Sequence, residues 1–216
     1  MKLWSFGGGP GSVSYTLFDG LRKLLNRILS EYLYASIMRT GPRGLRTLEA
    51  GSGPGYCSSL ITLKDGAVAS TILDLDRAPL DLAARRDKKI QIVQGDLYSM
   101  PFPNDAFDLV FNSSTMEHLS SFDLAYREMV RVTQPEGTIF VGVPYKYGPF
   151  LPFNLVPPTH PVSVWMGKLY SRRQLRKACQ MDGLVEKHSR LYFFGCFVGV
   201  LLSKEGASRG RGGPPP

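Results

Sequence analysis

The sequence is poor in the features that define several classes of protein. Its 216 residues include three cysteines, Cys57, Cys179 and Cys196, which are odd in number and lack the spacing of metal ligands. A disulfide scaffold and a zinc site are therefore not expected, whereas a reducing cytoplasmic compartment is. The longest apolar run, residues 191–202, is shorter than the roughly 20 residues of a membrane-spanning helix. These absences favour a water-soluble cytoplasmic protein.

Positive charge is in excess, but it is spread unevenly. The formal net charge is +8, and residues 1–46 and 168–190 each carry seven basic against two acidic side chains. The rest of the chain is slightly acidic. Such basic segments are typical of contacts with anionic substrates, anionic membrane surfaces or RNA, and also of an ordinary solvated surface. Composition alone leaves these alternatives open.

The chain divides into three parts. Residues 1–44 are predicted to contain a flexible leader, residues 5–14, followed by an amphipathic helix over residues 17–38, because leucines recur there at helical spacing while basic side chains face elsewhere. Residues 45–204 are expected to form one domain, with a proline-rich insertion at residues 144–170. Residues 205–216 are rich in glycine and proline and are expected to be disordered.

Short apolar runs alternate with helical patterns through the central domain. That rhythm is typical of a parallel sheet covered by helices on both faces. The last two runs are joined by so short a connection that they must form an antiparallel pair. The expected strands are residues 45–50, 68–74, 90–94, 107–113, 137–144, 185–193 and 196–204. The expected helices are residues 56–64, 78–86, 120–133 and 171–183.

A glycine loop lies between the first strand and its helix. The stretch LEAGSGPGY, residues 48–56, has three glycines at alternate positions. A dinucleotide site needs a glycine at the sixth position, where this chain has Tyr56, and the Gly-Lys-Ser/Thr ending of a phosphate-binding loop is absent. Glu49 would repel a pyrophosphate and attract a cation. The loop is therefore predicted to bind something other than a dinucleotide.

S-adenosylmethionine meets these requirements. It carries an ammonium group for Glu49 and an amino-acid end that fits against bare backbone. Its ribose diol needs a carboxylate, and Asp74 stands at the end of the second expected strand, with Asp76 as the alternative. Its adenine needs a polar partner near the end of the third strand, where Asp96 stands.

Four stretches in order carry a family resemblance. They are LEAGSGPG, ILDLDRAPLDLA, QGDLYSMPFPNDAFDLVFNSSTMEHL and REMVRVTQPEGTIFVGVP. Over roughly residues 45–203 the chain resembles class I S-adenosylmethionine-dependent methyltransferases of the type 11 kind. The resemblance implies an α/β fold: a Rossmann-like, doubly wound, seven-stranded sheet, mostly parallel with an antiparallel strand 7, in the order 3-2-1-4-5-7-6, with helices on both faces. One departure is Glu136, where the family often has a second glycine.

The resemblance also implies the residues of a cofactor site. Around the methionine part these are Glu49, Gly51, Ser52, Gly53 and Gly55. Around the nucleoside they are Asp74 and Leu75 at the ribose, and Asp96 with the Leu97 backbone N–H at the adenine. Asn112 and Ser113 would line the wall near the sulfonium. The expected product is S-adenosylhomocysteine, and no metal is implied.

The sequence does not decide whether methyl transfer uses a general base. Alignment of a nucleophile with an activated methyl group supplies up to about 7–11 kcal/mol, whereas a positioned base adds roughly 10²–10⁴-fold. His118 is the candidate base because it follows the fourth strand, although a histidine packed on a helix would look the same. His160 and Tyr145 lie in the proline-rich insertion, where the family builds its acceptor pocket. Substitutions of Asn112 and His118 are expected to lower turnover more than cofactor affinity.

The acceptor is predicted to be a small molecule of hydrophobic or lipid-like character. The insertion and its flank carry the apolar side chains Phe150, Phe153, Leu155 and Trp165. One alternative is an RNA or protein methyltransferase that uses the basic segments, with nucleic acid the less favoured partner. Another is a non-catalytic protein that binds S-adenosylmethionine, because a fold does not guarantee an activity.

The amphipathic N-terminal helix has two interpretations. The resemblance implies a lid over the cofactor, with Tyr15 and Phe18 near the acceptor. The basic amphipathic pattern also suits a helix that lies on a membrane surface. Flotation with anionic vesicles separates the two interpretations.

Overall fold

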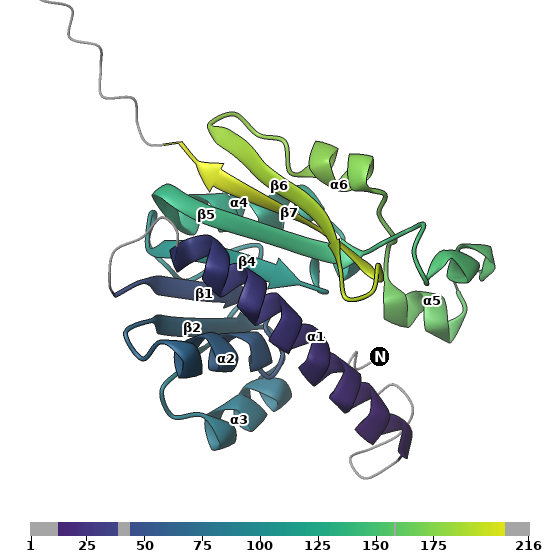
Figure 1. The fold of residues 1–216 in the computed structure, drawn as a ribbon, viewed down its shortest axis with the longest axis horizontal. Helices are drawn as coiled ribbons and strands as arrows, with labels where there is room; N and C mark the ends of the chain where they lie inside the picture. Colours follow the sequence, from purple (N-terminus) through teal and green to yellow (C-terminus); the bar gives the residue numbers. More distant parts are fainter. Residues whose placement is uncertain (1–12, 39–43, 158, 206–216) are drawn as a thin grey trace, which may run out of the picture.

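The computed structural model of the chain describes residues 13–38, 44–157 and 159–205 (Figure 1). Its strands are β1 (Arg46–Ala50), β2 (Ala69–Asp74), β3 (Gln91–Gln94), β4 (Phe107–Ser113), β5 (Thr133–Pro144), β6 (Leu184–Tyr192) and β7 (Phe197–Lys204). They form one seven-stranded sheet in the order β3-β2-β1-β4-β5-β7-β6. Neighbours from β3 to β5 are parallel, while β7 runs antiparallel to both β5 and β6. The predicted fold class and strand order are confirmed.

Helices cover both faces of this sheet. They are α1 (Val13–Met38), α2 (Tyr56–Lys64), α3 (Arg77–Arg86), α4 (Phe122–Val132), α5 (Pro161–Met166) and α6 (Arg172–Ala178), with short 3₁₀ turns η1 (Met116–His118) and η2 (Leu151–Leu155). Leu33 of α1 and Ile61 of α2 are buried in the core on one face, and Met129 of α4 and Leu175 of α6 in the core on the other. Figure 1 shows α1 in front of the sheet and α4 behind it. Both faces of the sheet are thus covered by helices, as in a doubly wound fold.

The start of β5 differs from the prediction. The strand begins at Thr133, directly after α4, because the stretch expected as a turn is a bulge within the strand. Glu136 has φ 66°, and a Cβ at Gly137 would lie 2.7 Å from the carbonyl oxygen of Gln134. Glu136 therefore adopts the left-handed conformation that glycine accepts at lower cost. This is the position at which the resembling family often has glycine.

The first helix is longer than predicted and only half of it packs on the sheet. It begins at Val13, inside the stretch predicted as a leader. Leu29 and Leu33 in its second half are buried, whereas Leu21 and Leu24 in its first half are exposed. Figure 1 shows that this first half extends past the carboxyl ends of the strands. Neither α1 nor any other helix of the described ranges is long and apolar enough to cross a bilayer.

Two glycines face each other across β5 and β7. Gly142 and Gly199 are register partners in the antiparallel pair. A Cβ at Gly142 would lie 2.2 Å from the hydroxyl oxygen of Tyr192, and one at Gly199 would lie 2.6 Å from ring atoms of Phe140. The ring centroids of Phe140 and Tyr192 are 5.9 Å apart. Because Gly142 and Gly199 have no side chains, the rings of Tyr192 and Phe140 can lie directly against the backbone at these positions.

Candidate functional site

The glycine loop has a conformation that depends on its glycines. Gly51, Gly53 and Gly55 have φ values of 71°, 54° and 62°, all in the left-handed region. The Gly51 N–H donates a 2.8 Å hydrogen bond to the Leu73 carbonyl at the end of β2. A Cβ at Gly51 would lie 2.6 Å from Cγ2 of Thr115, whose hydroxyl donates to the Gly51 carbonyl at 2.8 Å. The loop is therefore held between the ends of β2 and β4.

Glu49 lies beneath this loop as a buried acid. Its Oε2 accepts hydrogen bonds from the Ser58 N–H at 3.0 Å and the Ser58 hydroxyl at 2.7 Å. Burial raises the pKa of Glu49 to about 7, although these bonds and the charge of Arg86 oppose the shift. A cation that approaches Glu49 would favour the charged carboxylate. The site therefore fits the ammonium group of an amino-acid ligand.

Asp74 and Asp76 have different surroundings. The Asp74 carboxylate accepts hydrogen bonds from the backbone N–H groups of Gly53, at 2.7 Å, and Asp76, at 2.9 Å. Partial burial raises its pKa. The Asp76 carboxylate caps α3 by accepting a hydrogen bond from the Ala78 N–H at 3.0 Å. Asp74 therefore faces the glycine loop while Asp76 serves the helix, which favours Asp74 as a ligand-binding group.

Asp96 and Leu97 follow β3 at the same edge of the sheet. The Gly95 N–H donates to the Asp74 carbonyl at 3.0 Å, which ties this turn to the end of β2. The Asp96 carboxylate accepts from the Tyr98 N–H at 2.9 Å and is exposed, and Leu97 is buried. Leu75 is exposed beside them. Glu49, Asp74 and Asp96 thus all lie near the carboxyl ends of three neighbouring strands, β1, β2 and β3.

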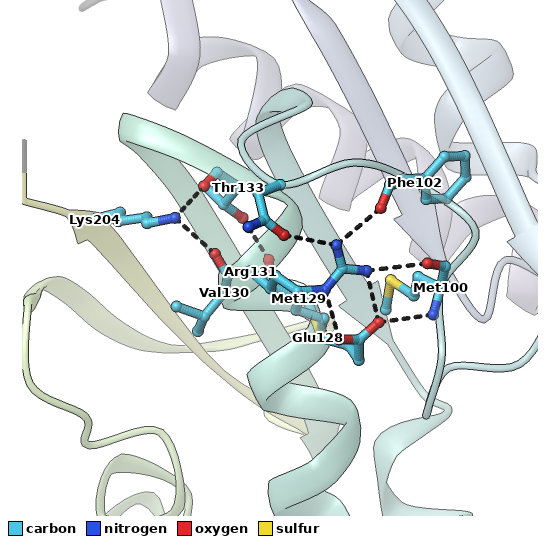
Figure 2. A network of polar contacts seen from close by, with 9 residues as sticks. Met100, Phe102, Glu128, Met129, Val130, Arg131, Thr133 and Lys204 are labelled. Atoms are coloured by element: carbon cyan, nitrogen blue, oxygen red, sulfur yellow. Dashed lines mark hydrogen bonds and ion pairs between the residues drawn. The ribbon is translucent and has the colours of Figure 1, made fainter.

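A network behind this edge fixes the turn that carries Asp96 (Figure 2). The Arg131 guanidinium of α4 donates to the carbonyl oxygens of Phe102, at 2.8 Å, and Met100, at 3.0 Å. It also forms an ion pair with Glu128 at 2.6 Å, and Glu128 accepts from the Met100 N–H at 2.7 Å. Figure 2 shows Lys204 of β7 capping carbonyls at the end of the same helix. The position of the turn is thus set by α4.

Asn112 and Ser113 end β4 with their polar groups engaged. The buried Asn112 side chain donates to the Ala50 carbonyl and accepts from the Met116 N–H at 3.3 Å. It therefore links β1 to η1 and holds the wall in place. The Ser113 hydroxyl is 3.0 Å from the Tyr192 hydroxyl. These bonds favour a positioning role for Asn112 over direct contact with reacting atoms.

The three candidate acid–base side chains lie in different settings. His118 is half-buried at the end of η1, and burial lowers its pKa. His160 is exposed, and its backbone N–H donates to the Pro157 carbonyl. The Tyr145 N–H donates to the Cys196 carbonyl at 2.8 Å. Of these three residues, His118 is the one in the same turn as Thr115, whose side chain contacts Gly51 of the glycine loop.

Several predicted acceptor-side groups cannot be placed. The side chains of Tyr15, Phe18, Phe153 and Trp165 lie outside the described residues. Leu155 is exposed on η2. Phe150 packs its ring 5.8 Å from that of Phe197 at the start of β7. The predicted apolar acceptor surface therefore remains a prediction.

Two residues of the site were not found from the sequence. Arg86, in the last turn of α3, donates to the Pro54 carbonyl at 2.6 Å and the Ser59 hydroxyl at 2.8 Å. Its guanidinium also lies 4.3 Å from the ring centroid of Tyr56. Glu117 is buried next to His118, and burial raises its pKa to about 8. Neither residue belongs to the glycine motif, and glutamate and arginine are ordinarily surface residues.

One groove lies away from this edge. It has a volume of about 930 Å³ and lies between α1 and the face formed by β5, β6 and β7. Its lining includes Tyr32, Glu136, His188 and Arg190. Within the described residues no group of three or more His, Cys, Asp or Glu side chains is arranged to hold a metal ion. None of the predicted cofactor-site residues lines this groove.

Comparison with known proteins agrees with this geometry. The family described as "Methyltransferase domain" matches residues 48–141. The malonyl-[acyl-carrier protein] O-methyltransferase of Halorhodospira halophila is 32% identical over 47% of this chain and 35% of its own length. The demethylmenaquinone methyltransferase of Mycobacterium marinum is 32% identical over 58% of this chain and 57% of its own. The chain therefore spans between about a third and just over half of these curated relatives.

A solved structure shows the same fold. It is a chain from the complex between the Haloferax volcanii Trm112 methyltransferase activator and a methyltransferase. The TM-score is 0.68 at 14% sequence identity, with 87% of this chain and 93% of that chain covered. At that identity the likeness concerns the fold alone. In the matched residues, the strand order and the glycine loop, this chain resembles the class I S-adenosylmethionine-dependent methyltransferases.

Proposed function

We propose that this protein transfers a methyl group from S-adenosylmethionine to a small-molecule acceptor by in-line displacement, leaving S-adenosylhomocysteine. The observation that carries the proposal is the set of acids Glu49, Asp74 and Asp96, which meets at one edge of the sheet around a left-handed glycine loop. In open α/β sheets, ligands bind outside the carboxyl ends of the strands. A cation flanked by polar groups at both ends matches this arrangement of acids.

Each part of the cofactor has a candidate partner in the chain. Glu49 and the loop from Gly51 to Gly55, with Ser52, would hold the amino-acid end. Asp74 would accept hydrogen bonds from both ribose hydroxyls, beside Leu75. Asp96 and the Leu97 N–H would meet the adenine. When bound, the cofactor supplies an activated methyl group on a positively charged sulfur.

The chain contributes alignment more than chemical groups. Asn112 and Thr115 fix the wall after β4 against Ala50 and Gly51, so the acceptor side and the cofactor side are held by the same hydrogen bonds. Such preorganisation supplies much of the rate when two reactants must line up. The two relatives are named for a malonyl group on a carrier protein and for demethylmenaquinone. Their names support a small-molecule acceptor.

Removal of the Asp74 carboxylate tests the proposal. A hydrogen bond to a charged group contributes roughly 1.5–3 kcal/mol, so Asp74→Ala should weaken S-adenosylmethionine binding by about ten- to a few hundred-fold in titration calorimetry. Asp76→Ala is the matched control, because it removes a carboxylate two residues away that caps α3. It should lower thermal stability slightly and leave affinity near that of the unmodified chain. Equal affinities for all three proteins would rule out this site.

A second candidate, an RNA methyltransferase, has one supporting observation. Arg172, Arg173 and Lys177 are exposed on α6, and Arg176 pairs with Glu186 at 2.7 Å. Anionic polymers bind such surfaces with affinities that fall steeply with salt. RNA binding with that dependence would favour this candidate. The same exposed basic side chains on α6 would also suit a small anionic substrate.

A further inference from the structure

Glu117 is an enclosed carboxyl group, and one of its two oxygens is buried without a hydrogen-bond partner. Its side chain is 2% exposed, and its Oε2 makes no hydrogen bond. Buried polar groups in folded proteins are nearly always paired, so an exception at a ligand-binding edge calls for a functional explanation. Glu117 lies in η1, two residues after Thr115, which holds the Gly51 carbonyl. Glu117 therefore lies in the turn that Thr115 ties to the glycine loop.

The backbone of Gly167 packs closely against the side chains of Glu117 and His118. A Cβ at Gly167 would lie 2.8 Å from both Cγ of Glu117 and Nδ1 of His118. The Lys168 N–H donates a 3.0 Å hydrogen bond to the Glu117 carbonyl. Oε1 of Glu117 is 3.9 Å from Nε2 of His118, whose side chain is 17% exposed. His118 is thus the more accessible member of the pair, and Glu117 is the more deeply buried one.

Among the residues that the structure describes, no lysine or arginine side chain is placed to hold Glu117 ionised. Burial and then the charge of Glu117 raise the pKa of Tyr170, and burial and the same charge raise the pKa of Tyr192. The Lys168 ammonium lies 5.1 Å from the ring centroid of Tyr170. Burial raises the pKa of Glu117 to about 8 and lowers that of His118. Near neutral pH the pair therefore holds one proton, on Glu117.

We propose that Glu117 and His118 form the proton-accepting pair of the methyl-transfer site, so that the acceptor carries an exchangeable proton, as a hydroxyl does, and is not a carboxylate. The inference rests on the proposed function. It assigns His118 the contact with the acceptor. Glu117 is the positioning residue behind it, and its charge offsets that of a bound sulfonium.

The proton balance follows from the charges. Binding of a cation favours ionised Glu117, so the proton of the pair leaves to solvent when the cofactor binds. In the transfer, the bond between sulfur and the methyl carbon breaks and a bond between that carbon and the acceptor oxygen forms. The acceptor proton passes to His118 and is shared with Glu117. The sulfur ends neutral and the pair ends protonated, so the enclosed site holds no unbalanced charge at either stage.

Calorimetry of the full chain tests this pair without an acceptor. S-adenosylmethionine and S-adenosylhomocysteine share the ammonium and carboxylate, so proton release that involves Glu49 cancels in their difference and only the sulfur charge remains. Titrations near pH 7.5 in buffers of different ionisation enthalpy should show roughly 0.5–1 more proton released with S-adenosylmethionine. Glu117→Gln should abolish that difference. Glu186→Gln, at an exposed strand position, should keep it.

The outcomes separate this inference from the function on which it rests. If neither ligand binds, the proposed function fails first. If both bind and the proton difference persists in Glu117→Gln, the pair is wrong and the cofactor site stands. Turnover with an alkylphenol should fall roughly 10²–10⁴-fold in His118→Gln. Methylation of the fatty acid of matched chain length, at a rate unchanged in Glu117→Gln and His118→Gln, would overturn the inferred acceptor class.

Discussion

Glu49 and Glu117 are buried acids whose charged forms the fold disfavours. Burial raises their pKa values to about 7 and about 8, compared with roughly 4.3 in an unfolded chain. The folded state therefore binds more protons than the unfolded state between about pH 4.5 and 8. Stability must fall as pH rises through this window and level off above it. The site is thus held at a thermodynamic cost that a cationic ligand would offset.

Replacement of Glu117 by glutamine should reveal this cost. Glutamine keeps the shape and carries no charge, so Glu117→Gln should be more stable than the unmodified chain at pH 8.5, by on the order of 3 kcal/mol. At pH 5 both carry a neutral side chain and should be similar. Urea unfolding at the two pH values measures the difference. A gain of the same size at both would mean that charge burial is not the cause.

At the scale of secondary-structure elements, two arginines attach the loops of the site to helices. Arg86 joins α3 to the glycine loop, and Arg131 joins α4 to the turn after β3. Both donate to backbone carbonyl oxygens of these loops. Loops that must meet a ligand without reorganising need such supports. The helices thus act on the ligand through the backbone of the loops.

Loss of the Arg86 clamp should weaken ligand binding. Arg86→Met removes hydrogen bonds to Pro54 and Ser59 while keeping much of the aliphatic stem. The freed loop must then be ordered on binding, so S-adenosylmethionine affinity should fall about tenfold in calorimetry. Arg85→Met, at an exposed neighbour in the same helical turn, is the control. Equal effects of the two substitutions would argue against a clamp.

Loss of Arg131 should show mainly in stability. Arg131→Met removes the guanidinium donor from the carbonyls of Met100 and Phe102 and from the carboxylate of Glu128, which keeps the Met100 N–H as a donor. A cost of about 2–4 kcal/mol in unfolding free energy is expected, because charged hydrogen bonds contribute roughly 1.5–3 kcal/mol each and these act as one network. Arg127→Met breaks an exposed pair with Asp123 in the same helix and should cost under about 0.5 kcal/mol. Comparable losses in denaturant titrations would contradict the assignment.

The sequence predicted the alternation of strands and helices from short-range patterns, and it predicted that three acids lie near strand ends; their role in cofactor binding stays a prediction. Strand order came with the ordered motifs, and Asp74 with its place at a strand end. Arg86 and Glu117 could not be predicted in this way. Arg86 contacts a loop some thirty positions earlier in the chain, and the burial of Glu117 depends on Gly167, in an insertion whose path the motifs do not determine. The bulge at Glu136 was missed since one residue in a left-handed conformation lets a strand continue through an expected turn.

At the scale of the whole molecule, the basic excess is partly used within the fold. Arg22 and Lys23 of α1 lie 5.2 and 5.6 Å from the ring centroid of Tyr56, which Arg86 approaches from α3. The first half of α1 thus packs beside the glycine loop with its basic side chains turned toward the domain. This arrangement supports the interpretation as a lid over the one as a membrane-surface helix.

Vesicle flotation should therefore leave the protein in the dense fraction. With anionic vesicles at moderate salt, the full chain is expected not to rise, because two of the basic side chains of α1 are occupied by Tyr56. Neutral vesicles give the matched control. Rise with anionic but not neutral vesicles would favour the membrane-surface interpretation instead.

The facing glycines of β5 and β7 restrict how this protein can diverge. Adding one methyl group at Gly142 or Gly199 would displace the ring of Tyr192 or Phe140, and with it the hydroxyl contact between Tyr192 and Ser113. These four positions, on three neighbouring strands, therefore constrain one another's substitution. A lineage could alter one of them only by passing through a damaged intermediate, so new acceptor preferences should arise in the insertion between residues 144 and 170 and not in the sheet.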